Sequence, residues 1–349
     1  MESGMSILKA GIIGQGRSGY GIHASAIAEL ADKYIIAAVS DPIAERRERA
    51  AAQFDCDAYK DYRSLFMRND LDFVVNTLPS HLHSPVSLEL LDAGFNVVCE
   101  KPVARYTQEM DTLIKKAEEK QKVLTVYQQH RFSPAFLKIK ELIESGILGR
   151  AVMVKIAANN FSRRWDWQTL KEYYGGNLLN TGPHFLDQAL QLMGTDIMPE
   201  IKCCMDSVNA SGDAEDHVKL IMSSPGRPTI DLEISSCSAY PQNMYQVYGS
   251  NGGLTGDLTR LEWRYFKPEE APEQPVVMDT SQIGADNLKW YEAQWGLPKE
   301  QADLWPYMAK CYYQNLYNAF TGSAPFEVSL DEMRQQVAVL EECHRQNNL

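Results

Sequence analysis

The fold of this chain is decided by the stretch Ile7-Leu8-Lys9-Ala10-Gly11-Ile12-Ile13-Gly14-Gln15-Gly16-Arg17-Ser18-Gly19, where an almost wholly apolar strand runs into three glycines spaced G-x-G-x-x-G. Each glycine has a physical role in a dinucleotide-binding turn: Gly14 permits the tight turn, Gly16 lets the main chain approach a pyrophosphate, and Gly19 lets helix and strand pack closely. Apolar residues then recur every four positions, as on one face of a helix whose start offers N–H groups to phosphates: Ile22, Ala26 and Leu30. We therefore predict that the whole turn binds a dinucleotide: Gly14, Gln15, Gly16, Arg17, Ser18 and Gly19.

An acidic residue follows the next predicted strand, Tyr34–Ser40. This residue, Asp41, lies twenty-two residues beyond Gly19. A carboxylate at this place binds the ribose hydroxyls of the adenosine half and repels a 2′-phosphate. The alternative is a helix-capping Asp in a surface turn before Pro42. We predict a nicotinamide dinucleotide site that favours NAD over NADP.

The bulk composition limits the class of protein. The chain has 349 residues, 44% of them apolar, which is enough for two domains with substantial cores. A net charge of −12, without a basic cluster that interleaves aromatic residues, argues against a nucleic-acid partner. We see no signal-peptide pattern and no apolar run of membrane-spanning length, so we expect neither export nor a membrane partner. The seven cysteines are scattered without a C-x-x-C pair, which favours free thiols in a cytoplasmic protein and no zinc or other metal site.

The first half of the chain, residues 1–128, alternates strands and helices. This is the pattern of a doubly wound parallel sheet, so we predict an α/β domain of the Rossmann type that binds NAD. Strands are predicted after the first one at Tyr34–Ser40, Asp72–Asn76, Asn96–Cys99 and Val123–Tyr127. Helices are predicted between them at about Pro42–Gln53, Pro85–Ala93 and Thr107–Lys120.

The second half, residues 129–349, has successive strands without helices between them. That pattern predicts an α+β domain with a mostly antiparallel sheet. A helix at Ser133–Ser145 precedes the strands Ala151–Ala158, Ile201–Val208, His217–Met222, Thr229–Ser236, Met244–Gly249 and Leu261–Phe266. Two helices are predicted to close the chain: the first ends near Phe320, and the second begins with a capping box from Ser329 to Glu332.

Polar side chains follow two strands of the predicted parallel sheet, at the carboxyl ends where ligands of such sheets lie. One segment is Thr77-Leu78-Pro79-Ser80-His81-Leu82-His83 and the other is Glu100-Lys101-Pro102. A lysine at this edge can donate to a substrate hydroxyl or a developing alkoxide, although a lone lysine in an exposed turn is the alternative. No acidic or cysteine cluster completes a metal site around His81 and His83, which favours loop histidines beside the cofactor. We place six of these residues at the cofactor, together with Gln129, which lies just after the last predicted strand of this sheet: Thr77, Leu78, Pro79, His83, Glu100, Lys101 and Gln129.

A second chemically dense segment begins at Arg163-Arg164-Trp165-Asp166-Trp167 and continues through Tyr173 and Tyr174. Aromatic faces stack on the C–H side of a sugar, and arginines donate to hydroxyls or a carboxylate. We therefore predict that Arg163, Trp165 and Tyr174 line a pocket for a polyhydroxylated ring. The alternative is that the tryptophans are core residues and the arginines are solvated.

The helix that carries His184 has two candidate starts. If Asn177 caps it, Asn180 and His184 lie four residues apart on one helical face. If it begins at Pro183, His184 lies in the first turn, where the helix dipole favours a neutral imidazole. Neutral imidazole is the form that takes a hydroxyl proton near neutral pH. A hydrogen-bonded structural histidine is the alternative.

Taken together, these segments resemble the Gfo/Idh/MocA family of nicotinamide-dependent sugar and cyclitol oxidoreductases over nearly the whole chain. The resemblance rests on Gly14-Gln15-Gly16-Arg17-Ser18-Gly19, Thr77-Leu78-Pro79 with His83, Glu100-Lys101-Pro102, Arg131-Phe132, Gly175-Gly176 leading to His184 and Asp187, and the turn at residues 247–253. It implies a Rossmann domain and a second domain with a large open-faced sheet. It also implies a carbohydrate or cyclitol substrate between the domains, and a homodimer or homotetramer formed through that sheet.

The resemblance also implies roles for three residues. Lys101 and His184 take the positions of the family's catalytic lysine and histidine. The lysine hydrogen-bonds the reacting oxygen, and the histidine exchanges its proton as hydride moves to or from C4 of the nicotinamide. Asn180 departs from the family, which usually has aspartate four residues before the histidine. Because asparagine brings no charge to the imidazole, we expect a less basic His184, and we count Asn180 with the catalytic residues and, like His184, with those that bind substrate.

The expected function is therefore an NAD-dependent dehydrogenase, or a ketone reductase in reverse, that acts on a secondary hydroxyl of a sugar, glycoside or cyclitol. Two alternatives fit the same fold. One is a glycosidase that oxidises the sugar transiently, eliminates the aglycone and reduces the product with NAD regenerated. The other is a non-catalytic, nucleotide-sensing regulator, against which the presence of both Lys101 and His184 argues.

Overall fold

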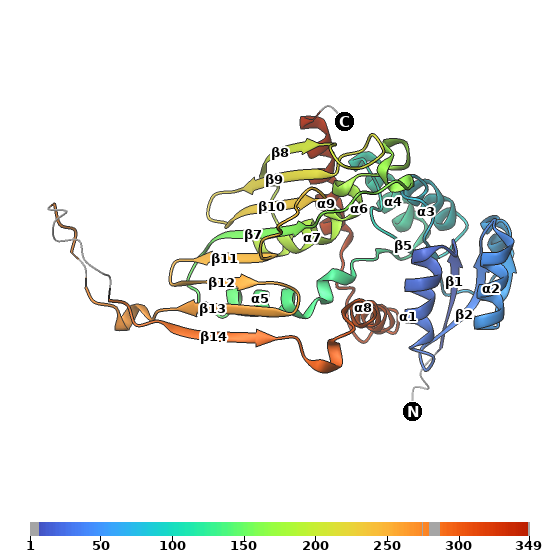
Figure 1. The fold of residues 1–349 in the computed structure, drawn as a ribbon. Coiled ribbons are helices and arrows are strands. Elements are labelled where there is room, and N and C mark those ends of the chain that lie inside the picture. The colour runs from blue at the N-terminus through green and yellow to red at the C-terminus, as the bar shows by residue number, and fades with distance from the viewer. Residues whose placement is uncertain (1–6, 274, 279–286, 348–349) are drawn as a thin grey trace, which may run out of the picture.

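The chain forms two β-sheets with helices packed between and against them (Figure 1). The computed structural model describes residues 7–273, 275–278 and 287–347. One sheet is entirely parallel, and the other is mostly antiparallel. This confirms the predicted fold class, a doubly wound α/β domain followed by an α+β domain.

In the described residues, the first sheet has six strands in the order β3-β2-β1-β4-β5-β6. They are β1 (Leu8–Ile13), β2 (Tyr34–Ser40), β3 (Asp57–Tyr59), β4 (Phe73–Asn76), β5 (Val97–Cys99) and β6 (Leu124–Val126). All residues of β4 and β5 are buried, because helices cover both faces of the sheet. The strand order reverses between β1 and β4, which makes the carboxyl ends of these two strands the expected ligand crevice.

The helices of this sheet agree with the predicted ranges to within about two residues, apart from the one after the glycine turn. They are α2 (Ala44–Phe54), α3 (His83–Asp92) and α4 (Thr107–Lys120). The first helix instead opens as a π-helix, η1 (Gly19–Ala24), and continues as α1 (Ser25–Ala28). The π-helical turn places His23, and not Ile22, fully inside the core. The short edge strand β3 was not predicted.

The second sheet has eight strands among the described residues, in the order β14-β13-β12-β11-β7-β10-β9-β8. They are β7 (Ala151–Asn159), β8 (Glu200–Asp206), β9 (His217–Ser223), β10 (Thr229–Ser235), β11 (Tyr245–Gly249), β12 (Gly252–Gly256), β13 (Arg260–Tyr265) and β14 (Tyr291–Gly296). Neighbours are antiparallel except the central pair β7 and β10. Helices lie on one face, and the other face is open (Figure 1). Strands β12 and β14 were not predicted.

Three helices cover the packed face of the second sheet: α5 (Pro134–Glu144), α7 (Gly182–Met193) and α9 (Leu330–Gln346). The remaining long helix, α8 (Leu304–Phe320), packs against β1 and β2 of the first sheet. Helix α9 begins with the predicted capping box of Ser329 and Glu332, and its side chains enter the cores of both sheets. The last strand of the first sheet ends at Val126, and the first strand of the second sheet begins at Ala151. Helices α8 and α9, near the end of the chain, pack back against the first sheet.

Within the described part of the chain, we find no helix both long and apolar enough to cross a membrane.

Candidate active site

The glycine turn follows β1 and has the geometry that its motif predicts. Gly14 has a φ of +86°, and a Cβ there would lie 3.0 Å from the carbonyl oxygen of Thr77. A Cβ at Gly19 would lie 1.8 Å from the carbonyl oxygen of Gly14. A Cβ at Gly16 would meet nothing nearer than the Arg46 guanidinium at 3.9 Å. The protein itself therefore requires glycine at 14 and 19, whereas position 16 is open, as expected for a close approach by a ligand.

Asp41 lies at the carboxyl end of β2, beside this turn, and it is 4% exposed. Its Oδ2 accepts from the main-chain N–H of Gln15 at 2.7 Å, and its Oδ1 accepts from that of Ile43 at 2.8 Å. A carboxylate has about four acceptor positions, so capacity for ribose hydroxyls remains on the same oxygens. The Gln15 side chain turns inward to the carbonyls of Ile12 and Gly14, so the contribution of Gln15 to the turn is its main chain. Arg17 is exposed.

The segment after β4 is fixed to the turn and to the segment after β5. The Thr77 hydroxyl donates to the carbonyls of Ile13 and Gly14 at 2.9 and 3.0 Å. The ring nitrogens of His83 face the carbonyl oxygens of Leu78 at 2.7 Å and Pro102 at 2.8 Å. His83 is buried, so the structure places it as a connection between the two loops that follow β4 and β5.

Lys101 and Asn180 come together although they belong to different halves of the chain. The Lys101 ammonium donates to the main-chain oxygen of Asn180 at 2.7 Å. Burial lowers the pKa of Lys101, the Glu100 carboxylate opposes this, and the positive charges of Arg17 and Arg164 add to the lowering. The site therefore holds an amine that loses its proton more readily than an exposed lysine.

The imidazole of His184 is buried near Lys101 and makes no hydrogen bond to any other described residue. Helix α6 (Asn177–Asn180) ends before it, and α7 begins at Gly182, so His184 lies in the first turn of α7, close to the second of the two predicted starts. Its Nδ1 is buried without a partner among the described residues, and no hydrogen bond to Nε2 is found there either. Burial lowers the pKa of His184 well below 6.5, and the neighbouring His130 and Lys101 lower it further. The imidazole is therefore neutral and free to bind a ligand.

The ring of His184 begins a row of aromatic side chains that the sequence analysis missed. His130, in the short helix η4 (Gln129–Phe132), stacks on it with centroids 4.1 Å apart at 15°. Trp305, at the start of α8, lies 5.2 Å from His130 and is 55% exposed. This row joins the buried imidazole to the molecular surface. Neither residue lies in a motif that could have identified it, because the contact depends on α8 returning to the first sheet.

The side chain of Asn180 is held by a second residue that was not predicted, Gln168. The amide nitrogen of Gln168 donates to Asn180 Oδ1 at 2.9 Å, and Arg164 hydrogen-bonds the Gln168 carbonyl. Arg164 also pairs with Asp166 at 2.7 Å. Because Asn180 and His184 lie in separate helices, the predicted arrangement of both on one helical face is not formed, and no hydrogen bond joins their side chains in the described residues.

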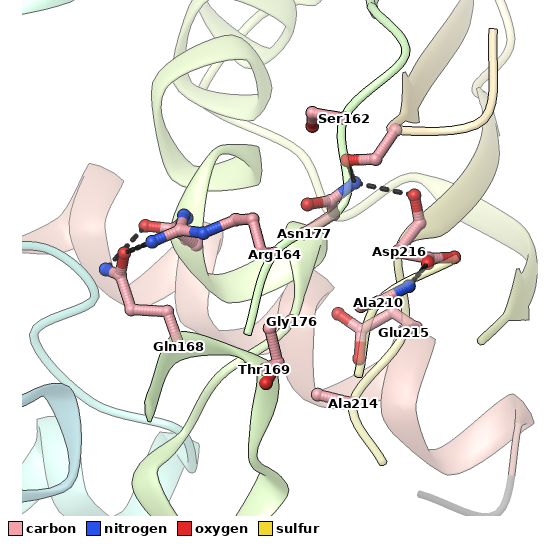
Figure 2. Close-up of a pocket in the computed structure, with 12 residues that line it drawn as sticks. Ser162, Arg164, Gln168, Thr169, Gly176, Asn177, Ala210, Ala214, Glu215 and Asp216 are labelled. Carbon is pink, nitrogen blue, oxygen red and sulfur yellow. Dashed lines mark hydrogen bonds between the residues drawn. The ribbon is translucent and has the colours of Figure 1, made fainter. Parts of the chain in front are cut away.

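Asn180, Gln168 and Arg164 also line a small pocket, which has room for about one water molecule (Figure 2). Figure 2 shows Arg164 and Gln168 on one side of it and Glu215 and Asp216 on the other. Glu215 is 4% exposed, and burial raises its pKa to about 7 in spite of a hydrogen bond from the main-chain N–H of Leu178. A carboxyl group that can be neutral therefore lies behind the Asn180 segment.

The three residues predicted to line a sugar pocket lie apart from one another. Trp165 is 81% exposed, and the Arg163 guanidinium reaches only the carbonyl of Asn209 at 3.4 Å. The Tyr174 hydroxyl donates to Glu109 on α4 at 3.3 Å. The structure therefore leaves the first two side chains at the surface and places Tyr174 in a contact with the first domain.

Two further residues of the quoted motifs have structural contacts. Arg131 forms a buried bidentate ion pair with Asp187 at 2.7 and 2.8 Å, and it also pairs with Glu332 on α9. This ties η4, α7 and α9 together around the catalytic candidates. Gln129, predicted at the cofactor, is 8% exposed and has an unpartnered buried Oε1.

Within residues that the structure describes, we find no group of three or more His, Cys, Asp or Glu side chains that could hold a metal ion. All seven cysteines are free.

Known proteins share both the sequence motifs and the fold. Residues 8–128 match the family model of the Gfo/Idh/MocA oxidoreductases with an NAD-binding Rossmann fold, and residues 136–255 match the model of the Gfo/Idh/MocA C-terminal domain. The chain is 27% identical over 286 residues to a 2,7-anhydro-N-acetylneuraminate hydratase from Mediterraneibacter gnavus, which covers 77% of this chain and 75% of that protein. It is 26% identical over 260 residues to a myo-inositol 2-dehydrogenase from Thermotoga maritima, with coverages of 72% and 76%.

A solved structure shows the same fold over both domains. The WlbA dehydrogenase from Bordetella pertussis, in complex with NADH and UDP-GlcNAcA, superposes with a TM-score of 0.80 at 23% identity and covers 98% of this chain and 96% of its own. Both family models match in order along the chain, and together they span most of residues 8–255. The chain therefore belongs to the Gfo/Idh/MocA family of NAD-binding oxidoreductases.

Proposed function

We propose that this enzyme moves hydride between the nicotinamide of NAD and a secondary hydroxyl, or the matching ketone, of a sugar, glycoside or cyclitol. The observation that carries the proposal is the buried, unpartnered imidazole of His184 beside a lysine of lowered pKa. Buried polar groups are rarely left without a partner, so such a group in a crevice is explained by a ligand that supplies one. A polyhydroxylated ring supplies hydroxyl groups that can do so.

The proposed roles follow from the two protonation states. In the oxidising direction, neutral His184 accepts the hydroxyl proton while the carbon loses hydride. The Lys101 ammonium donates a hydrogen bond to the same oxygen and stabilises its developing negative charge. The bound nicotinamide supplies the hydride acceptor. In the reducing direction, protonated His184 returns the proton to the oxygen, and Lys101 again donates a hydrogen bond to it.

The residues of the first sheet fit a dinucleotide. The open position at Gly16 leaves room for a pyrophosphate, the turn leads into a helix start, and Asp41 lies where the ribose hydroxyls of NAD would meet a carboxylate. We assign the phosphates to Gly14, Gly16, Arg17, Ser18 and Gly19, with the main chain of Gln15. The nicotinamide is assigned to the segments that carry Thr77, Leu78, Pro79, Glu100, Lys101 and Gln129, with His83 connecting two of them.

The relatives support the substrate class. One is named as an inositol dehydrogenase, and the solved neighbour holds a nucleotide sugar acid. The row of rings from His184 through His130 to Trp305 supports it independently, because the C–H face of a sugar packs on exposed aromatic rings. We propose a cytoplasmic homo-oligomer, in which a second subunit covers part of the open face of the second sheet.

Cofactor reduction measured by ultraviolet absorbance tests the proposal. Purified protein is mixed with NAD, then NADP, across monosaccharides, sugar acids, cyclitols and glycosides. We expect one substrate group to reduce NAD, with turnover lowered about 10²–10⁴-fold in Lys101→Met and His184→Gln. His344→Gln, a buried histidine of α9, serves as the matched control and should keep its activity. NAD binding without turnover on any compound would overturn the proposal and favour a nucleotide-sensing regulator.

A second candidate function is transient oxidation followed by elimination. The observation that favours it is the relative named as a hydratase, since hydration involves no net change in the cofactor. In this case no NADH accumulates with any compound of the panel, and the aglycone is released from a glycoside. Release of aglycone at catalytic levels of NAD distinguishes this function from a dehydrogenase, which consumes NAD with every turnover.

A further inference from the structure

His23 is a buried histidine that has no part in the proposed mechanism. It is hydrogen-bonded to Glu100, the residue that precedes Lys101. His23 belongs to the π-helix η1 and is fully buried. Its Nδ1 lies 2.6 Å from the Tyr313 hydroxyl on α8, and its Nε2 lies 3.2 Å from Glu100 Oε1. A chain of contacts therefore runs from the helix of the glycine turn to the segment after β5.

The protonation of this chain follows from the carboxylate. Burial on its own raises the pKa of Glu100, but the hydrogen bond from His23, together with electrostatic attraction to His23, Lys101 and His83, brings this pKa to about 2. Glu100 is therefore ionised, and the nitrogen that faces it must carry a proton. The other ring nitrogen of His23, Nδ1, is hydrogen-bonded to the Tyr313 hydroxyl, which fixes the orientation of the ring.

The second oxygen of Glu100 is also occupied. Its Oε2 accepts the main-chain N–H of Lys101 at 3.1 Å. Within the described residues, no carboxylate lies within ion-pair distance of the Lys101 ammonium, which instead donates to the carbonyl of Asn180. Both oxygens of Glu100 thus have other partners, and neither forms an ion pair with the ammonium of the very next residue.

We propose that His23 is a positioning residue for Lys101, which holds Glu100 against the lysine main chain and away from the lysine ammonium. The effect is that Lys101 stays unpaired and free to face the reacting oxygen. Without His23, the carboxylate can turn to the ammonium and form an ion pair in a buried site, where such a pair strongly favours the charged lysine. The inference rests on the proposed function only in the role that it gives to Lys101; the contacts themselves do not depend on it.

Other charged groups around Lys101 stay in place in the test. The groups whose charges act on it or respond to it are Glu100, Arg17, Arg164, His83, His130 and His184. A substitution at His23 or Tyr313 leaves all of these residues present and acts on Lys101 through Glu100, whose contacts it changes. A shift in the titration of Lys101 therefore reports the position of Glu100.

The chain offers a matched control for the contact with Tyr313. Tyr127 is also buried, and its ring packs on the same histidine at a tilt of 51°, with centroids 4.3 Å apart. Its hydroxyl, however, has no hydrogen-bond partner among the described residues. Tyr313→Phe and Tyr127→Phe thus make the same chemical change on two rings around His23, and only the first removes a hydrogen bond to it.

The experiment measures the titration of Lys101 by competitive labelling with acetic anhydride. The holoprotein with NAD is labelled across a pH series, and the Lys101 peptide is quantified by mass spectrometry against that of Lys115, whose side chain is 77% exposed. We expect His23→Phe to raise the labelling midpoint of Lys101 by about one pH unit. His23→Gln, which keeps an N–H donor, should raise it less. Tyr313→Phe should raise it partly, and Tyr127→Phe should leave it at the wild-type value.

An unchanged midpoint in folded His23→Phe would overturn the proposal. If that variant does not fold, the tyrosine pair decides: equal midpoints in Tyr313→Phe and Tyr127→Phe would overturn it as well. The readout needs no substrate. An absence of turnover across the sugar panel would therefore count against the proposed function without testing the role of His23. An unchanged Lys101 midpoint would count against the role of His23 without testing the proposed function.

Discussion

The Lys101 ammonium and the main-chain oxygen of Asn180 are joined by a hydrogen bond of 2.7 Å that crosses from the first domain to the second. The lysine follows β5, and the asparagine ends α6. Because the lysine is held by a main-chain atom, the side chain at position 180 can differ without moving it. The Asn180 side chain instead accepts from Gln168.

Asn180→Asp should move the pH profile of turnover to higher pH. The new carboxylate keeps the hydrogen bond from Gln168 but adds a negative charge near Lys101 and His184, which favours their protonated forms. We expect a shift of about one pH unit in the profile of kcat. Gln168→Ala, which loosens the same amide without a charge, should change kcat or KM but not the pH profile. A profile that does not move in Asn180→Asp would contradict the expected influence of the charge.

In the oxidising direction, the fall of kcat/KM on the acid side of its pH profile (the acid limb) should lie below pH 6.5. Burial, then His130 and Lys101, lower the pKa of His184 well below 6.5, so the imidazole stays neutral and able to accept a proton at lower pH than an exposed histidine. His130→Phe keeps an aromatic ring in the stack and removes one of these causes, so it should move the limb upward. The measurement is kcat/KM against pH, with His344→Gln as the control that leaves the limb in place. A wild-type limb at the ordinary histidine value would be inconsistent with this environment.

Asp41→Ser should weaken the binding of NAD and reduce the preference of the protein for NAD over NADP. The substitution removes both the proposed ribose acceptor and the bond to the Gln15 main chain, so NAD affinity should fall about tenfold or more, which is about 1.4 kcal/mol. Calorimetry gives the dissociation constants of NAD and of NADP, and their ratio is the quantity that tests the role of Asp41. A looser turn would weaken the binding of both cofactors alike and leave this ratio unchanged. Asp32→Ser, an exposed residue before β2, should leave both constants unchanged. An unaltered ratio in Asp41→Ser would remove Asp41 as the source of the preference.

Glu215→Gln should stabilise the protein at alkaline pH. Burial raises the pKa of Glu215 from 4.5 to about 7, so folding favours the protonated carboxyl. Its contribution is fully present below pH 4.5 and is lost as pH rises to about 7. Above that pH, the Glu215→Gln variant should have a free energy of unfolding about 1–3 kcal/mol higher than the wild type, or a Tm a few degrees higher. At pH 4.5 the substitution should make little difference. Thermal melts across this range check the prediction, with exposed Glu118→Gln as control; equal gains at both ends would show another cause.

Trp305→Ala should raise KM for the true substrate about three- to tenfold with a smaller effect on kcat, because Trp305 extends the rings of His130 and His184 toward the surface. The sequence predicts a similar rise for Trp165→Ala, although that side chain is 81% exposed. Trp290→Ala serves as the control, because Trp290 precedes β14 and its ring packs on Phe266, which follows β13. Steady-state kinetics in all three variants decide between the two approaches to the site. Unchanged KM in both Trp305→Ala and Trp165→Ala would place the substrate elsewhere.

Local sequence was sufficient for the parallel sheet and for the glycine turn. The strands before and after the turn are short, mostly apolar runs, and most of their residues are buried. Gly14 and Gly19 can be read from their spacing because main-chain atoms lie where their Cβ atoms would be. Strand β14 and the π-helical turn were missed, because strand pairing and the widening of a helix depend on neighbours distant in sequence.

The sequence by itself determined the fold class, the order of the two domains and the identity of the catalytic candidates, because strand patterns and motifs are local in the chain. Only the tertiary structure decided which residues surround them. His130 stacks on His184, Gln168 holds Asn180, and His23 reaches Glu100 through contacts between residues far apart in sequence. Burial sets the protonation of Lys101 and His184, and burial is a property of the packed molecule that no local pattern of residues contains.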